Sequence, residues 1–102
     1  MDAAVVFSAL VEPRRREMLR LLRERPLTSR EIRTRLSITQ QAVSQHLQLL
    51  TAAGLVKPDH LGRGRHYALA ADGFEAVDRF LSELWPDGLH RLKAVAERQG
   101  DD

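Results

Sequence analysis

The chain has 102 residues, enough for one domain with a modest hydrophobic core. Hydrophobic residues make up 43% and charged residues 29%, a balance typical of a soluble globular domain rather than a disordered chain. There are no cysteines, which excludes disulfides, thiol redox sensing and thiolate metal sites. No apolar run approaches the roughly 18–20 residues that span a bilayer, and the start of the chain lacks the basic region of a signal peptide. We therefore expect a cytoplasmic protein with no membrane partner.

The net charge of +2 hides an uneven distribution along the chain. Residues 13–65 carry twelve Lys and Arg against four Asp and Glu, whereas residues 66–102 carry four basic and eight acidic side chains. A basic segment beside an acidic one indicates that one face binds a polyanion. The alternative is that exposed helices simply carry charge.

The first half of the chain is predicted to be helical. Residues 3–11 form a short apolar helix, and Pro13 suits the first turn of the next helix, where a missing N–H is no loss. Pro26 ends that second helix. Thr28 and Glu31 then form a capping box, which predicts the start of a third helix.

A fourth helix and a β-hairpin follow. Thr39 is expected to be the N-cap of the fourth helix, which extends to residue 53 and stops at Gly54 in a left-handed conformation. Two strand-like segments at residues 55–60 and 65–69 predict the hairpin.

The hairpin and the last helix complete the predicted elements. Pro58 cannot donate to a sheet ladder, so its strand is expected at an edge. Asp72 with Glu75 is expected to cap a long last helix, which Pro86 kinks or breaks. The apolar residues of this helix are spaced by three, four and three positions; they are Phe74, Val77, Leu81 and Leu84.

The fourth helix has two different faces. Val43, Leu47 and Leu50 share one face and are expected to pack into the core. The opposite face carries three amides and a hydroxyl and no charge: Gln41, Ser44, Gln45 and Gln48. Gln can pair bidentately with adenine, and Ser is an adaptable partner for base edges. An ordinary surface helix is the alternative, because amides and hydroxyls are commonly exposed.

The arrangement predicts a mainly α fold with a small β-hairpin. Two short helices joined by a tight turn over residues 28–53 form a helix-turn-helix, and the basic hairpin over residues 55–69 forms a wing. We expect residues 1–102 to make one winged helix-turn-helix domain. Phosphate attraction is expected from the arginines next to the fourth helix and at the wing, namely Arg30, Arg33, Arg63 and Arg65.

Four sequence runs carry a family resemblance. They are ALVEPRRREML at 9–19, AVSQHL at 42–47, AGLV at 53–56 and GRGRHYAL at 62–69. Together the runs resemble the ArsR/SmtB family of winged-helix repressors over about residues 3–85. The resemblance implies a homodimer that binds a partly palindromic operator on double-stranded DNA and represses transcription, with the fourth helix in the major groove. The predicted DNA-binding residues are Thr39, Gln40, Gln41, Ser44, Gln45, His46, Gln48, Arg63 and Arg65.

The sequence departs from the metal-sensing members of that family. Residues 28–33 read TSREIR and lack the Cys-Val-Cys site, and the last helix lacks the first His of the Asp-x-His pattern. His60 and His66 could meet across the hairpin, but zinc needs three or four ligands. His46 is expected to contact a phosphate or a neighbouring helix, and His90 has no histidine partner at helical spacing. We therefore expect no metal site and no cofactor.

The first and last helices are predicted to form a dimer interface, over residues 1–12 and 71–99. Their apolar side chains exceed what one small domain can bury, although some of them belong to its own core. The predicted interface residues are Val5, Val6, Leu10, Phe74, Leu81, Leu84 and Trp85.

Two other functions remain open. One is a repressor that responds to a metal or a small molecule. The other is a winged-helix module that binds protein, which an uncharged wing and an apolar fourth helix would indicate. We expect no enzyme, because Ser44 and His46 lie two apart on a helix and cannot form a nucleophile–base pair.

Overall fold

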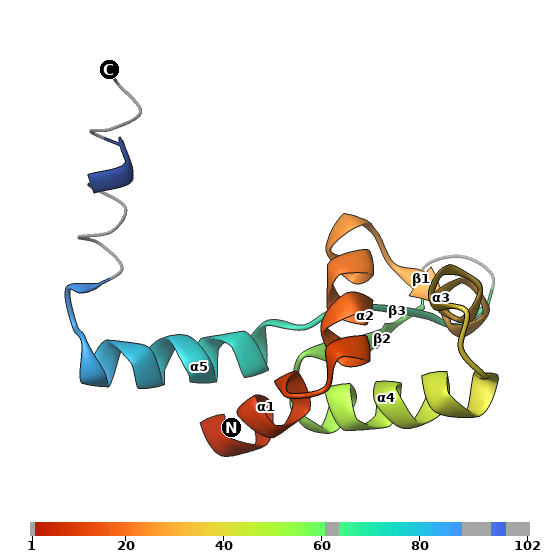
Figure 1. Ribbon diagram of the computed structural model, residues 1–102, viewed down its shortest axis with the longest axis horizontal. Coiled ribbons are helices and arrows are strands. Elements are labelled where there is room, and N and C mark those ends of the chain that lie inside the picture. Colours follow the sequence, from red (N-terminus) through yellow and green to blue (C-terminus); the bar gives the residue numbers. More distant parts are fainter. Residues whose placement is uncertain (1, 61–63, 89–94, 98–102) are drawn as a thin grey trace.

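The computed structural model describes residues 2–60, 64–88 and 95–97 (Figure 1). In chain order its elements are α1 (Ala3–Leu10), α2 (Pro13–Glu24), β1 (Leu27–Thr28), α3 (Ser29–Leu36), α4 (Gln40–Ala52), β2 (Val56–Asp59), β3 (His66–Leu69) and α5 (Ala71–Leu84). The predicted mainly α fold with a helix-turn-helix and a hairpin is confirmed.

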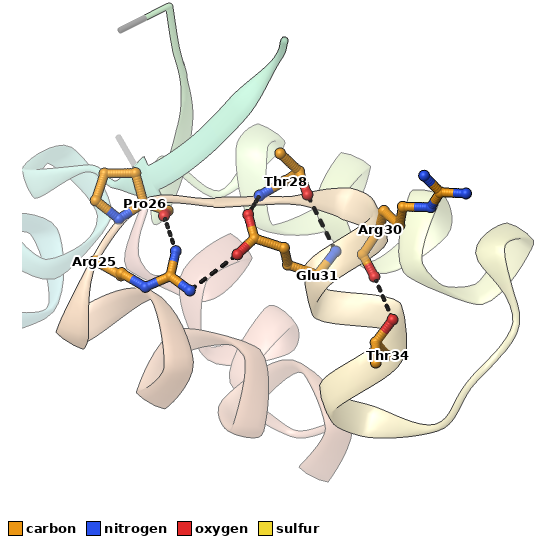
Figure 2. Close-up of polar contacts among 6 residues, drawn as sticks. All are labelled: Arg25, Pro26, Thr28, Arg30, Glu31 and Thr34. Carbon is orange, nitrogen blue, oxygen red and sulfur yellow. Dashed lines mark hydrogen bonds and ion pairs between the residues drawn. The ribbon is translucent and has the colours of Figure 1, made fainter. Parts of the chain in front are cut away.

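Side-chain caps fix where α3 and α4 begin. The Thr28 hydroxyl accepts a hydrogen bond from the Glu31 N–H, and the Glu31 carboxylate accepts one from the Thr28 N–H, both at 3.1 Å (Figure 2). These two bonds complete the predicted capping box. The Thr39 hydroxyl caps α4 by accepting from the Ala42 N–H at 3.1 Å. Because each start is fixed, the faces that the two helices present are fixed as well.

The sheet contains one more strand than the sequence analysis predicted. Its order is β1-β3-β2, and both pairings are antiparallel. The additional strand, β1, is two residues long and pairs Leu27 with Tyr67 and Thr28 with His66. A strand this short shows no period-two pattern. Pro58 lies in β2 at a sheet edge, as predicted.

The core lies where α1, α2, α3, α4, the sheet and the first turns of α5 meet. Fifteen described hydrophobic side chains are buried there, and no described polar or charged side chain is buried. The residues of α4 in this core are Val43, Leu47 and Leu50, which are 0%, 4% and 0% exposed. The predicted inward face of this helix is confirmed, and its burial turns the opposite face to the solvent.

The last helix begins differently from the prediction. Asp72 does not cap α5, because Ala70 is the N-cap residue and no side chain bonds to the helix start. The Gly73 N–H instead donates to the Gly54 carbonyl at 2.8 Å, which anchors α5 to the turn after α4. A Cβ at Gly73 would collide with the Ala53 carbonyl oxygen and lie 2.8 Å from Leu55 Cδ2. Close backbone approach therefore takes the place of a cap.

Beyond this anchor α5 extends away from the rest of the fold, with α1 packed along it (Figure 1). The Phe7 and Phe80 rings meet edge to face, with centroids 5.7 Å apart. The helix ends at Leu84, just before Pro86, as predicted. None of the described helices combines the length and apolar character that crossing a bilayer requires.

Candidate nucleic-acid interface

The exposed face of α4 carries the uncharged polar side chains identified in the sequence. Gln41, Ser44, Gln45 and Gln48 are all exposed, on the face opposite the buried Val43, Leu47 and Leu50. Thr39 and Gln40, at the start of the helix, are exposed as well. These exposed side chains carry hydroxyl and amide groups and no charge. Such groups can form hydrogen bonds with base edges. We name these four side chains, Gln41, Ser44, Gln45 and Gln48, the reading face.

A tight turn connects α3 to α4. Ser37 adopts a left-handed conformation, with φ of 54°, and its N–H donates to the Arg33 carbonyl at 2.9 Å. Thr39 starts α4 only two residues later. This turn makes α3 and α4 a helix-turn-helix, in which α4 takes the position of the second, recognition helix.

The basic side chains of α3 are available to bind an anion. The single acidic residue of α3, Glu31, is held by the Thr28 N–H and by an ion pair with Arg25 at 2.9 Å (Figure 2). These contacts lower the pKa of Glu31, the Thr28 hydrogen bond being the larger cause. Figure 2 shows the Arg30 guanidinium directed away from this cluster. Arg30 and Arg33 form no ion pair with any residue that the structure describes.

A hollow of about 510 Å³ separates α4 from the wing. Ser44 and Gln48 line it from α4, and Arg65 and Tyr67 line it from the wing side. Ser29, at the start of α3, lies on the same hollow. Hydroxyl, amide and guanidinium groups of this kind contact phosphates and sugars in protein–DNA complexes.

Arg65 lies over the ring of Tyr67, in the hairpin loop just before β3. Its guanidinium carbon is 5.6 Å from the ring centroid, within the range of a cation–π contact. Gly64, next to it, has a φ of +80° and open space around it. The predicted phosphate contact Arg63 lies outside the described residues. Tyr67 was not predicted to support Arg65, although the strand expected over residues 65–69 would place both side chains on one face.

His46 contacts a neighbouring helix, one of the two roles expected for it. Its Nδ1 lies 3.4 Å from Nη1 of Arg15 on α2. Partial burial lowers the pKa of His46, and the positive charge of Arg15 lowers it further. No sequence pattern indicates this contact, because the two residues lie 31 positions apart in the chain.

The histidines of the wing do not form a ready metal site. His66 pairs in register with Asp59 across the hairpin. No group of three or more His, Asp or Glu side chains suited to a metal ion lies within the described part of the chain. His90 is outside that part.

The predicted interface residues separate into exposed and buried ones. Along α1 and α5, five of them expose at least two fifths of their surface: Val5, Phe74, Leu81, Leu84 and Trp85. Val6 is 0% exposed, so it belongs to the core of the protomer and not to a free surface. Leu10 is half-buried and packs against that core. We name the exposed set Val5, Phe74, Leu81, Leu84 and Trp85 the apolar face.

Comparisons with known proteins agree with this geometry. A sequence model described as "Bacterial regulatory protein, arsR family" matches residues 12–57. The HTH-type transcriptional regulator Rv2034 of Mycobacterium tuberculosis is 32% identical over 94% of this chain and 90% of its own length.

Two further regulators are similar to this chain in sequence, and one solved structure is similar to it in fold. The transcriptional activator HlyU of Vibrio cholerae is 31% identical over 81% of this chain and 77% of its own. The transcriptional repressor SdpR of Bacillus subtilis is 31% identical over 63% and 71%. The ArsR-like transcriptional regulator from Rhodococcus sp. RHA1 is 29% identical, with a TM-score of 0.74, over 97% of this chain and 91% of that one.

Proposed function

Because this chain belongs to the ArsR family of DNA-binding transcriptional regulators, we propose that it is a homodimeric repressor that binds a partly palindromic operator. Each protomer inserts α4 into the major groove and contacts the flanking phosphates with α3 and the wing. The reading face of α4 is the observation that carries this proposal.

The reading face supports direct contact with bases. A helix that only faces solvent usually carries Lys and Glu, whereas this surface has three amides and one hydroxyl. Gln pairs bidentately with N6 and N7 of adenine, whereas the guanine contact is made mainly by Arg or Lys. We therefore expect adenine positions to dominate each half-site.

The arginines around α4 supply the attraction that does not depend on sequence. Arg30 and Arg33 lie on α3, which packs against α4, and Arg65 lies across the hollow from α4. Contacts between arginine and phosphate fix the register of a protein on the duplex and release counterions, so binding weakens as salt rises.

The apolar face supports the homodimer. Five large apolar side chains exposed on α1 and α5 are more than a soluble monomer usually leaves uncovered. A two-fold axis through this face would cover both copies with the same surface. It would also place two α4 helices side by side for half-sites about one duplex turn apart.

Repression is the direction that we propose, in agreement with the name of SdpR. The name of HlyU makes activation the alternative. A reporter gene placed behind the bound promoter, with and without the protein, separates the two: transcription should fall when the protein is present.

A fluorescence titration tests DNA recognition itself. The purified protein is titrated into a labelled duplex from upstream of its own gene and into a scrambled duplex, each at two salt concentrations. We expect tight, salt-sensitive binding that favours the upstream sequence. Equal and weak binding to both would mean that the operator lies elsewhere. No binding even at low salt would contradict the proposal and favour a module that binds protein.

A further inference from the structure

Arg15, on α2, contacts both α1, which carries part of the apolar face, and α4, which carries the reading face. Its Nε donates to the Ala9 carbonyl at 2.6 Å, and its Nη2 donates to the Ser8 carbonyl at 3.4 Å. Both acceptors belong to the last turn of α1. Its Nη1 lies 3.4 Å from Nδ1 of His46 on α4. One side chain of α2 therefore spans from the helix of the apolar face to the helix of the reading face.

Arg16 is a natural reference for Arg15. Its Nη1 donates to the Leu10 carbonyl at 2.8 Å and to the Val11 carbonyl at 3.0 Å. The last carbonyls of α1 have no donors within the helix, and its last turn has no basic residue of its own. Both arginines of α2 donate to these carbonyls, at the helix end where the dipole favours positive charge. Within the described residues Arg16 has no hydrogen bond or ion pair with α4, so the two side chains differ in the link to His46.

The contact favours a neutral His46. A guanidinium can only donate, so in this hydrogen bond Nδ1 of His46 accepts, which places the proton of the neutral ring on Nε2. A protonated ring would bring a second positive charge against Arg15. The charged groups that face His46 are Arg15, Arg14 and Glu12, all from α2 or its N-cap. The lowered pKa of His46 agrees with a neutral ring.

The contact occurs next to the reading face. His46 directly follows Gln45 on α4, and it is half-buried. A change in how His46 meets Arg15 would therefore change how the neighbouring amide is presented to a base edge.

We propose that Arg15 is a positioning residue that fixes the recognition helix α4 against α1 through the neutral ring of His46. The inference rests on the proposed function, since it assumes that α4 reads DNA and that α1 belongs to the dimer interface. Protonation of His46 removes the acceptor and separates the two side chains. The protein then loses discrimination between sequences, while the added charge strengthens its attraction to any duplex.

The test compares Arg15→Gln with Arg16→Gln. Each change removes one guanidinium and one positive charge from α2 and frees carbonyls at the end of α1. Three quantities are measured for each variant: the free energy of unfolding in urea, the pKa of His46 by NMR, and the affinity ratio between the preferred and the scrambled duplex from pH 5 to 8.

We expect similar losses of stability but different effects at α4. Arg15→Gln should raise the pKa of His46 and lower the affinity ratio at pH 8 by about fivefold or more, the lower end of typical coupling free energies between sites. Arg16→Gln should leave both close to wild type. The wild-type ratio should fall as the pH drops through the His46 titration. His46→Gln, which cannot titrate, should give a ratio that does not change between pH 5 and 8, whatever its value.

Equal effects of the two arginine variants on the affinity ratio would overturn the inference. So would a wild-type ratio that stays constant while NMR shows His46 becoming protonated. If the wild type binds no duplex, the proposed function has failed; the link to α4 is then still judged by the pKa of His46, which must rise more in Arg15→Gln than in Arg16→Gln.

Discussion

At the scale of single residues, the reading face of α4 combines chemical variety with the absence of charge. Amides offer a donor and an acceptor in a fixed geometry, which distinguishes one base edge from another. Charged side chains around them bind phosphates irrespective of sequence. Specificity and affinity are thus assigned to different side chains, and their variants should behave differently.

Gln45→Ala should remove base preference at one position of each half-site. We expect the preference there to fall by about 1–3 kcal/mol, the value of one good bidentate contact. Competition binding with duplexes substituted at single positions measures it. Arg65→Ala is the matched comparison, because it should weaken all duplexes alike and reduce the salt slope. A Gln45→Ala variant with an unchanged preference at every position would show that another residue reads the DNA.

Glu31 should give the folded state a dependence on acid pH. Its pKa is lowered below its ordinary value of 4.5 by the hydrogen bond from the Thr28 N–H and by Arg25. A lowered carboxylate pKa stabilises the fold above the ordinary value, and this contribution is lost as the pH falls through the folded value.

Glu31→Gln keeps an acceptor for the cap but cannot titrate. The difference in unfolding free energy between wild type and Glu31→Gln should therefore be largest near neutral pH and shrink below about pH 4.5. Urea unfolding at several pH values measures this difference. Glu24→Gln, an exposed change on α2, serves as the control. A difference that stays constant down to pH 2 would contradict the assignment.

At the scale of elements, local sequence signals determined most helix bounds. The capping box at Thr28 and the N-cap at Thr39 depend only on residues three positions away, so the sequence alone could locate them. β1 could not be predicted, because Leu27 and Thr28 become a strand only by pairing with Tyr67 and His66. The start of α5 was predicted wrongly, since its anchor is the distant carbonyl of Gly54.

The packing of α5 against the turn after α4 depends on Gly73. Gly73→Ala should destabilise the fold by about 1–3 kcal/mol, because the added methyl forces α5 away from the turn after α4. Helix propensity alone would predict the opposite sign. Urea unfolding compares this variant with Glu75→Ala, an exposed change on the same helix. Increased stability in Gly73→Ala would show that α5 does not approach Ala53 and Leu55 this closely.

At the scale of the whole molecule, the reading face and the apolar face have different origins in the sequence. The reading face follows from helical periodicity, and the structure places its four predicted residues together. The apolar face was predicted from an excess of apolar residues, and periodicity could not tell which of them the protomer itself covers. Val6 turned out to be core, whereas Leu84 is 69% exposed.

Leu84→Glu should weaken the proposed dimer. A carboxylate buried at a two-fold interface faces its own copy, so we expect the dissociation constant of the dimer to rise by about tenfold or more. Sedimentation velocity over a range of concentrations measures it. Thr34→Glu adds the same charge on α3 and should leave the dimer intact. A wild type that sediments as a monomer at all concentrations would contradict the dimer directly.

The central claim is that two copies of α4 read DNA from a symmetric pair of positions. Selection of bound duplexes from a random pool by the wild-type protein tests it most directly. We predict an inverted repeat whose half-sites lie about one helical turn apart and are dominated by adenine contacts. A pool that shows no enriched sequence after repeated rounds, or an enriched motif without two-fold symmetry, would contradict the account.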